Sequence, residues 1–269
     1  MSNIKTVNPW RTPTDNLPQA DDPERAKCRA TRCLPGEIAE YVLLPGDPGR
    51  AAMIAEQWLD EAKLVMANRE FHSYTGTYKN IPVSVISTGL GSPGATMVVQ
   101  DLPRLGVKAA IRVGTAGSAT EQVKPGDVVI ATAAVRDEGV SHQMIPSNYP
   151  AVADFSVCKS LHSAATNLDT TVHSGIVHTS DAFSSPNLAA IQKQYCEANV
   201  LAFEMEAAAV MVMATLNNTP LGCILSIDGY VKNVATGNTA PDGKARDRGI
   251  RSAINIALEA FVLQASDYA

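Results

Sequence analysis

Residues 199–216, NVLAFEMEAAAVMVMATL, hold a short apolar run followed at once by an alanine-rich segment. The run up to Phe203 is typical of a buried strand, and residues 206–217 are typical of a helix. The only charged side chains in this stretch, Glu204 and Glu206, lie at the junction. Ionised carboxylates are rarely buried without a partner, so the junction is either a helix start with a capping glutamate or a site for a polar ligand.

Five further runs rich in Val and Ile have the same character: EYVLLPG, IPVSVIST, KAAIRVG, DVVIATAAV and PLGCILSI. Helical patterns follow at residues 50–59, 95–105, 155–167, 188–198 and 244–264. This alternation predicts a single α/β domain over residues 39–269, with a central mixed, mostly parallel β-sheet flanked by helices. Residues 1–38 hold five of the sixteen prolines and many charges, which predicts an extended N-terminal arm. Ligands of such sheets bind beyond the carboxyl ends of the strands.

Composition excludes several classes of function. The net charge of −5 argues against a nucleic-acid partner. No apolar run approaches the length of about 18 residues that a membrane span needs, and no apolar leader is visible, so no membrane partner is expected. The five scattered cysteines predict reduced thiols and a cytoplasmic location. Cys28 and Cys33 lack metal-finger spacing, so no metal is expected.

Three motifs at predicted strand ends carry polar side chains. In LLPGDPGRA, Gly46 precedes a helix start and Arg50 lies in its first turn, which suits an anion, although a solvated Arg50 beside a simple turn has the same pattern. In IRVGTAG, Arg112 lies within an apolar strand and needs either an anionic ligand or an internal carboxylate. In SIDGY, Asp228 is either a functional acid or a turn residue before Gly229.

The segment GLGSPG, residues 89–94, matches the glycine pattern of dinucleotide-binding loops. An NADP-dependent oxidoreductase, with Arg112 near the cofactor phosphate, is therefore an alternative. The match follows a late strand, Pro93 occupies the variable part of the loop, and Arg112 lies inside its apolar run. These features count against a dinucleotide site.

Taken together, the motifs LLPGDPGRAAMIAE, AAIRVGTAGSA, TSDAFSSPN, FEMEAAAV and SIDGY resemble the bacterial-type nucleoside phosphorylases, which include hexameric purine nucleoside phosphorylase and uridine phosphorylase. The resemblance runs from about residue 37 to about residue 263. It implies phosphate-dependent cleavage of the N-glycosidic bond of a nucleoside, giving free base and ribose 1-phosphate. Inorganic phosphate would be the co-substrate, with no cofactor. It also implies a homo-oligomer of at least two chains, in the family a hexamer built as a trimer of dimers.

The resemblance also assigns roles to residues of the site. The phosphate-binding set would be Gly46, Arg50, Arg112 and Thr115, with Arg69 supplied by a neighbouring subunit. Glu206 would bind the ribose hydroxyls, with Met205 under the sugar and Glu204 in support. The base would lie against Phe183 and Phe203, and Asp228, assisted by Arg246, would be the acid that protonates it.

The choice of base remains open between purines and uracil. The first half of the chain is similar to uridine phosphorylases, but the glutamine and arginine that those enzymes carry shortly after TSDAF are missing, and Gln192 and Gln194 come later on a predicted helix. Asp228 matches the purine enzymes, so purines are favoured. Ser184 replaces a common aromatic residue, and no histidine lies near residues 28–36, which keeps methylthioadenosine as a substrate. A nucleosidase that uses water is disfavoured by the three arginines, and a non-catalytic nucleoside sensor is the remaining class.

Overall fold

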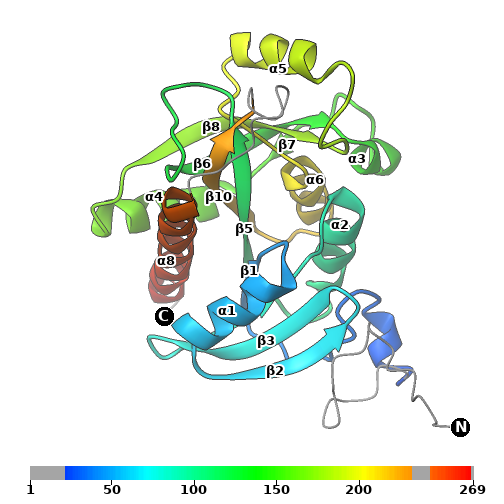
Figure 1. Ribbon diagram of the computed structural model, residues 1–269. Helices are drawn as coiled ribbons and strands as arrows, with labels where there is room; N and C mark the ends of the chain where they lie inside the picture. Colours follow the sequence, from blue (N-terminus) through cyan, green and yellow to red (C-terminus); the bar gives the residue numbers. More distant parts are fainter. Residues whose placement is uncertain (1–21, 232–242, 268–269) are drawn as a thin grey trace, which may run out of the picture.

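The computed structural model describes residues 22–231 and 243–267, and these form one α/β domain around a mixed sheet (Figure 1). The described strands are β1 Tyr41–Leu44, β2 Asp60–Asn68, β3 Phe71–Tyr78, β4 Ile81–Ile86, β5 Ala109–Ser118, β6 Val128–Asp137, β7 Ala151–Val152, β8 Val172–Ser180, β9 Ala202–Glu204 and β10 Leu221–Tyr230. Their order is β10-β6-β8-β9-β5-β1-β4-β3-β2, and β7 pairs with β6. Because β10 also pairs with β5, five of the strands form a closed ring.

The middle of the sheet is parallel. Strand β1 pairs in parallel with both β4 and β5, and β5 pairs in parallel with β10, so Leu44 lies opposite Arg112 and Arg112 opposite Cys223. The carboxyl ends of these four strands therefore meet at one edge, which is where α/β folds bind ligands. Strands β2 and β3 extend the sheet as an antiparallel hairpin.

Helices cover both faces of the sheet (Figure 1). They are η1 Arg25–Lys27, α1 Pro48–Trp58, α2 Ser92–Asp101, α3 Gly139–Met144, α4 Phe155–Asn167, α5 Leu188–Glu197, α6 Ala207–Leu216 and α8 Gly243–Asp267. Strand side chains alternate between the faces. In β1, Tyr41 and Leu43 pack with α1, α4 and α8, whereas Val42 and Leu44 pack with α2 and α6. Helix α6 is apolar all round because it lies inside this second core.

Most predicted elements are present. Helix α4 has the predicted bounds, and the other predicted helices begin and end within about three or four residues of their predicted ends. The hairpin β2–β3 and strand β8 were not predicted. Strand β2 is mostly exposed, so its apolar side chains are too few to form a continuous run.

The prediction of an unpacked N-terminal arm is wrong for residues 22–38, while residues 1–21 lie outside the described chain. Cys28, Ala30 and Cys33 are fully buried in the same core as α2 and α6. The Asp101 carboxylate at the end of α2 accepts hydrogen bonds from three successive backbone amides, those of residues 29, 30 and 31, at 2.9–3.1 Å. The packing rests on small side chains and backbone donors, which composition does not reveal.

Across the two described stretches of chain, no helix combines the length and the apolar character of a bilayer span.

Candidate active site

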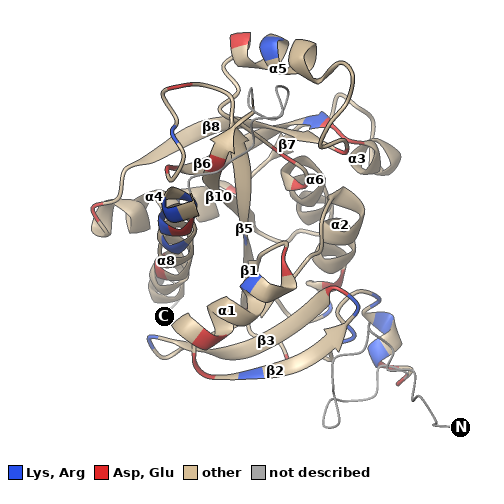
Figure 2. Cartoon of the chain, viewed as in Figure 1, with Lys and Arg blue, Asp and Glu red and all other residues tan. Residues whose placement is uncertain are grey.

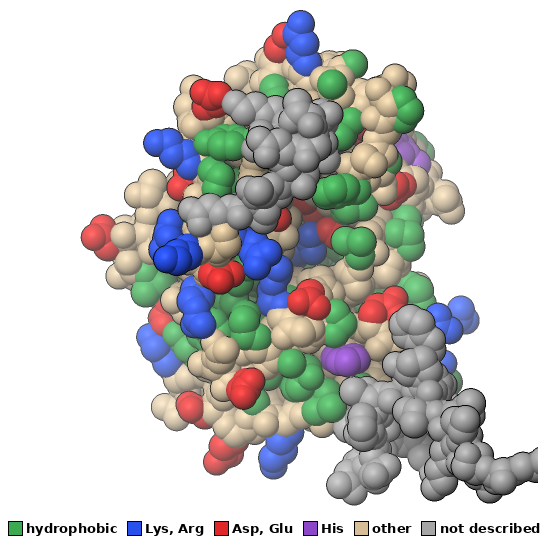
Figure 3. Space-filling view, viewed as in Figure 1, with side chains coloured by type: hydrophobic (Ala, Val, Ile, Leu, Met, Phe, Trp, Pro, Cys, Tyr) green, Lys and Arg blue, Asp and Glu red, His purple; other side chains and the backbone are tan. Residues whose placement is uncertain are grey.

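A cavity of about 820 Å³ lies at the carboxyl edge of the sheet. Figure 3 shows the recess on this face, with acidic and basic side chains in it. Its walls come from the segments after β1 and β4, from β5 and β10, from the end of β8 and from the β9–α6 junction. The predicted site residues that line it are Gly46, Arg50, Arg112, Thr115, Phe183, Phe203, Glu204, Met205, Glu206 and Asp228. Arg69 and Arg246 are not among its lining residues.

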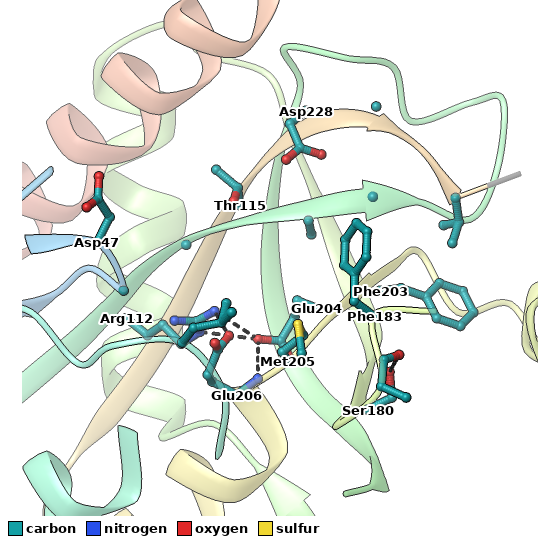
Figure 4. Close-up of a pocket in the computed structure, with 18 of the residues that line it drawn as sticks. Asp47, Arg112, Thr115, Ser180, Phe183, Phe203, Glu204, Met205, Glu206 and Asp228 are labelled. Carbon is teal, nitrogen blue, oxygen red and sulfur yellow. Dashed lines mark hydrogen bonds and ion pairs between the residues drawn. The ribbon is translucent and has the colours of Figure 1, made fainter. Parts of the chain in front are cut away.

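The floor of the cavity is a buried ion triad of Arg112, Glu204 and Glu206 (Figure 4). The Arg112 guanidinium lies 3.0 Å from the Glu204 carboxylate and forms a closer ion pair with Glu206. Burial opposes the charge on Arg112, but the two carboxylates raise its pKa above the ordinary value. The sequence predicted that Arg112 needs either an anionic ligand or an internal carboxylate. The structure shows two internal carboxylates, those of Glu204 and Glu206.

Glu204 is bonded by the protein on every side. Its carboxylate accepts hydrogen bonds from the Thr179 hydroxyl at 2.5 Å and from the backbone amides of Glu206 and Ala207 at 2.9 Å. Burial raises the pKa of this carboxyl, and the Glu206 charge adds to the effect. The carboxylate satisfies the first amides of α6, so Glu204 is the capping glutamate of the two.

Glu206 has a different position. One carboxylate oxygen accepts a hydrogen bond from the Gly91 amide at 2.6 Å, and the other pairs with Arg112. Each oxygen has two lone pairs, so each retains one acceptor site, and the side chain lines the cavity. Two adjacent acceptors are the arrangement that vicinal hydroxyl groups require.

The glycine-rich loop supports this carboxylate. Gly91 has φ of +89°, and its amide is the donor to Glu206, while the Ser92 hydroxyl donates to the Met205 carbonyl at 2.9 Å. The N-cap amide of α2 is thus already bonded to a protein carboxylate. A dinucleotide phosphate would need that donor, so the loop geometry argues against the oxidoreductase alternative.

The other end of the cavity is cationic. Arg50 lies in the first turn of α1, and its pKa is lowered by burial and by the positive charges of Arg112 and Arg246. Mutual repulsion among neighbouring cations favours an anion between them. Figure 2 shows basic positions at the start of α1 and at the start of α8. The first amides of α1 do not contribute as the sequence suggested, because the Asp47 carboxylate accepts from the amides of Gly49 and Arg50 at 2.9 and 3.2 Å.

Asp228 lies opposite the aromatic side of the cavity (Figure 4). The β10–β5 register shifts between Ile227 and Gly229, so Asp228 occupies a bulge that turns its side chain out of the ladder. Burial raises the pKa of its carboxyl, and the charges of Arg246 and Arg50 oppose that shift. An acid with a raised pKa in a partly buried pocket is suited to proton donation.

Aromatic residues form the wall facing Asp228. Phe183 is 66% exposed and projects into the open cavity, whereas Phe203 is held from behind by His178, whose ring centroid lies 4.7 Å away. Burial lowers the pKa of His178, so its ring is neutral at physiological pH and packs as an aromatic residue. The two phenylalanines offer flat apolar surface to a planar ligand.

The lining residues that were not predicted include four with larger side chains: Glu70, Leu188, Gln192 and Tyr230. Leu188 and Gln192 are one turn apart on α5, so the helix period could have placed them on one face. Among the described residues, no group of three His, Cys, Asp or Glu side chains is arranged to hold a metal ion.

Comparison with known proteins agrees with this architecture. Residues 40–262 match the family described as the Phosphorylase superfamily. A uridine phosphorylase of Thermococcus kodakarensis is 39% identical over 72% of this chain and 74% of its own. A guanosine phosphorylase of Halorubrum lacusprofundi is 35% identical over 84% of this chain and 94% of its own. The structure of a purine nucleoside phosphorylase from Toxoplasma gondii in complex with immucillin-H superposes with a TM-score of 0.81, at 29% identity over 86% of this chain and 94% of that one.

The family match and these relatives define the class of protein as a phosphorylase. The chain belongs to the nucleoside phosphorylases, which are pentosyltransferases, within the phosphorylase superfamily.

Proposed function

We propose that this chain is a purine nucleoside phosphorylase. Inorganic phosphate binds at the cationic end of the cavity, between Arg50 and Arg112, with the Thr115 hydroxyl beside it. The ribose hydroxyls bind the free acceptor sites of Glu206, and the base lies toward Phe183 and Asp228. In this order phosphate attacks the anomeric carbon from one side while the base leaves on the other.

In the transition state, a ribosyl cation lies between the entering phosphate and the leaving base. The buried triad carries one positive and two negative charges, so its net negative charge lies near the sugar. Fixed charges in a desolvated site stabilise such a state without reorganising. The protein therefore supplies an anion clamp, a sugar-binding carboxylate and an acid.

The purine preference rests on Asp228. A purine leaves more easily when its N7 accepts a proton or a hydrogen bond, and the raised pKa of Asp228 favours the protonated carboxyl. Uracil has no N7 and gives this residue no comparable task. A uridine phosphorylase remains the second candidate, because a relative with that name is 39% identical.

The proposed clamp is completed by a second subunit. Arg69 lies in the exposed two-residue turn between β2 and β3 and does not line the cavity of its own chain. The next residue of this turn, Glu70, lines the cavity, so the exposed Arg69 lies near the cavity mouth and is suited to reach a neighbouring subunit, which makes the working unit at least a dimer and, by resemblance, a hexamer. Five free cysteines support a cytoplasmic setting.

A substrate panel tests the proposal. Base release from inosine, guanosine, adenosine, methylthioadenosine and uridine is measured with and without phosphate. We expect release to need phosphate and to be fastest with a purine. Equal release in phosphate-free buffer would show a nucleosidase, and a preference for uridine over every purine nucleoside would show the second candidate.

A further inference from the structure

Gln192 is a buried polar side chain in the cavity wall that the proposed function does not use. It is 6% exposed, it lies on α5, and it lines the cavity together with Leu188. Its side-chain amide nitrogen has no hydrogen-bond partner in the described part of the protein. A buried donor without a partner is costly, so proteins rarely keep one unless a ligand or water completes it.

The surroundings of Gln192 locate it at the base end of the cavity. Helix α5 follows directly on the segment that carries Phe183, and it lies beyond the carboxyl end of β10 (Figure 1). Tyr230 and Val231, at that end of β10, line the same cavity. Arg112 lies on the side of the cavity away from Phe183 and Phe203, as Figure 4 shows.

A second, smaller cavity of about 420 Å³ shares Gln192, Tyr230 and Val231 with the first. Gln192 therefore lies in the wall between the two. Its amide has two possible partners: a ligand in the large cavity or water in the small one.

We propose that Gln192 determines base specificity by bonding to the lactam edge of the base, and this inference rests on the proposed function. A lactam edge has a carbonyl next to an N–H, as at C6 and N1 of hypoxanthine and guanine. The glutamine nitrogen donates to the carbonyl, and the glutamine oxygen accepts from the N–H. Asp228 from β10 and Gln192 from α5 then contact adjacent polar positions of the base, and Phe183 contacts its face.

The probe for this contact is a base that lacks the carbonyl. Rotation of the amide by half a turn exchanges its donor and acceptor, so adenosine also finds a complementary edge and does not discriminate. Purine riboside carries hydrogen at C6 and offers no carbonyl. A site built to bond a substrate carbonyl and its neighbouring N–H disfavours an analogue without them, because the buried amide then keeps at most one of its two bonds, to the unprotonated N1.

The experiment measures kcat/KM for inosine and for purine riboside in three proteins: the wild type, Gln192→Met and Gln194→Met. Methionine conserves the volume of glutamine without its donor and acceptor. Gln194 lies on the same helix and is exposed, so it is the matched control. We expect the preference for inosine over purine riboside to fall about tenfold in Gln192→Met, the effect of one net hydrogen bond. It should stay unchanged in Gln194→Met.

The ratio of two substrates in one preparation does not depend on the active fraction, so a merely structural role for Gln192 does not move it. An unchanged ratio in Gln192→Met would overturn the inference and assign the amide to water in the smaller cavity. Equilibrium binding of hypoxanthine and of purine to the same proteins gives the same comparison without turnover.

Failure of the purine assignment is distinguished from failure of the Gln192 inference, because it is seen in the substrate preference of the wild type. If the wild type cleaves only uridine, the proposed function is wrong, and the same variants are compared on uridine and on the analogue without the C4 carbonyl. A tenfold loss of preference supports the role of Gln192 with either base, and no loss overturns it.

Discussion

Replacing Arg112 is expected to destabilise the fold as well as the reaction. The side chains of Glu204 and Glu206 are 0% and 5% exposed, and both pair with this one guanidinium. Arg112→Met leaves two like charges about as close as before, with no cation between them. Breaking a buried ion pair from one side costs about 3–5 kcal/mol.

The sign of the pH dependence follows from the pKa of Glu204. Burial raises this pKa and Arg112 opposes the rise, so in the variant the folded-state pKa lies above the unfolded value and the folded state takes up a proton more readily than the unfolded chain. Stability is then lost as pH rises above the unfolded pKa. The difference in unfolding free energy between wild type and Arg112→Met should be largest near pH 8 and should shrink toward pH 5.

Urea unfolding at several pH values and one fixed protein concentration measures the difference. Arg50→Met is the matched control, because burial and neighbouring cations lower the pKa of Arg50 and the fold gains nothing from its charge. Adding Glu206→Gln to Arg112→Met removes one of the two charges and should restore part of the lost stability. Equal stability of the two arginine variants at pH 8, or a loss for Arg112→Met that does not change with pH, would refute the reasoning.

Three further outcomes are expected. Asp228→Asn should slow inosine phosphorolysis by about 10²–10⁴-fold and should slow that of 7-methylguanosine much less, because the base of 7-methylguanosine is already cationic. Since burial raises the pKa of Asp228, the wild-type rate on inosine should also fall with rising pH, whereas the rate on 7-methylguanosine should not. Equal pH profiles for the two substrates would count against an acid role. Gly114→Ala should cost about 1–3 kcal/mol in urea unfolding, because its Cβ would lie 2.8 Å from Leu225 and 2.9 Å from the Arg112 guanidinium, whereas Gly229→Ala, whose Cβ meets no described atom within 4 Å, should be neutral. Arg69→Ala should abolish most activity without dissociating the assembly, and light scattering of the wild type should give at least twice 28.5 kDa; a fully active monomer would contradict the shared site.

The sequence predicted the parallel core and its helices because apolar runs and helical periods are local signals. Arg112 could be assigned to a buried partner from its place in an apolar strand, but the identity of the partner required the fold, since Glu204 lies more than ninety residues away. The two junction glutamates were recognised as either cap or ligand site. The structure divides these roles: Glu204 bonds the start of α6, and Glu206 faces the cavity.

Features that depend on backbone geometry could not be predicted. The bulge at Asp228 is a register shift against β5, and no side-chain pattern marks it. Asp47 follows the expected capping rule, but whether its carboxylate or a ligand takes the amides of α1 depends on its rotamer. From the sequence, Gln192 was only a glutamine that lies too late to match the one in uridine phosphorylases. Its burial depends on how α5 packs, which the sequence does not reveal.

The bonds between Asp101 and residues 29–31 have a consequence for exchanging parts among relatives. The match to the family begins at residue 40, so the donors lie upstream of the shared region while the acceptor lies inside it. A chimera whose first 39 residues do not adopt this backbone turn would bury the Asp101 carboxylate without those amides, and burial already raises its pKa. Such a protein would have to hold a proton on Asp101 or leave the segment undocked. The segment and α2 therefore have to be exchanged together between relatives, although seventy residues of chain separate them.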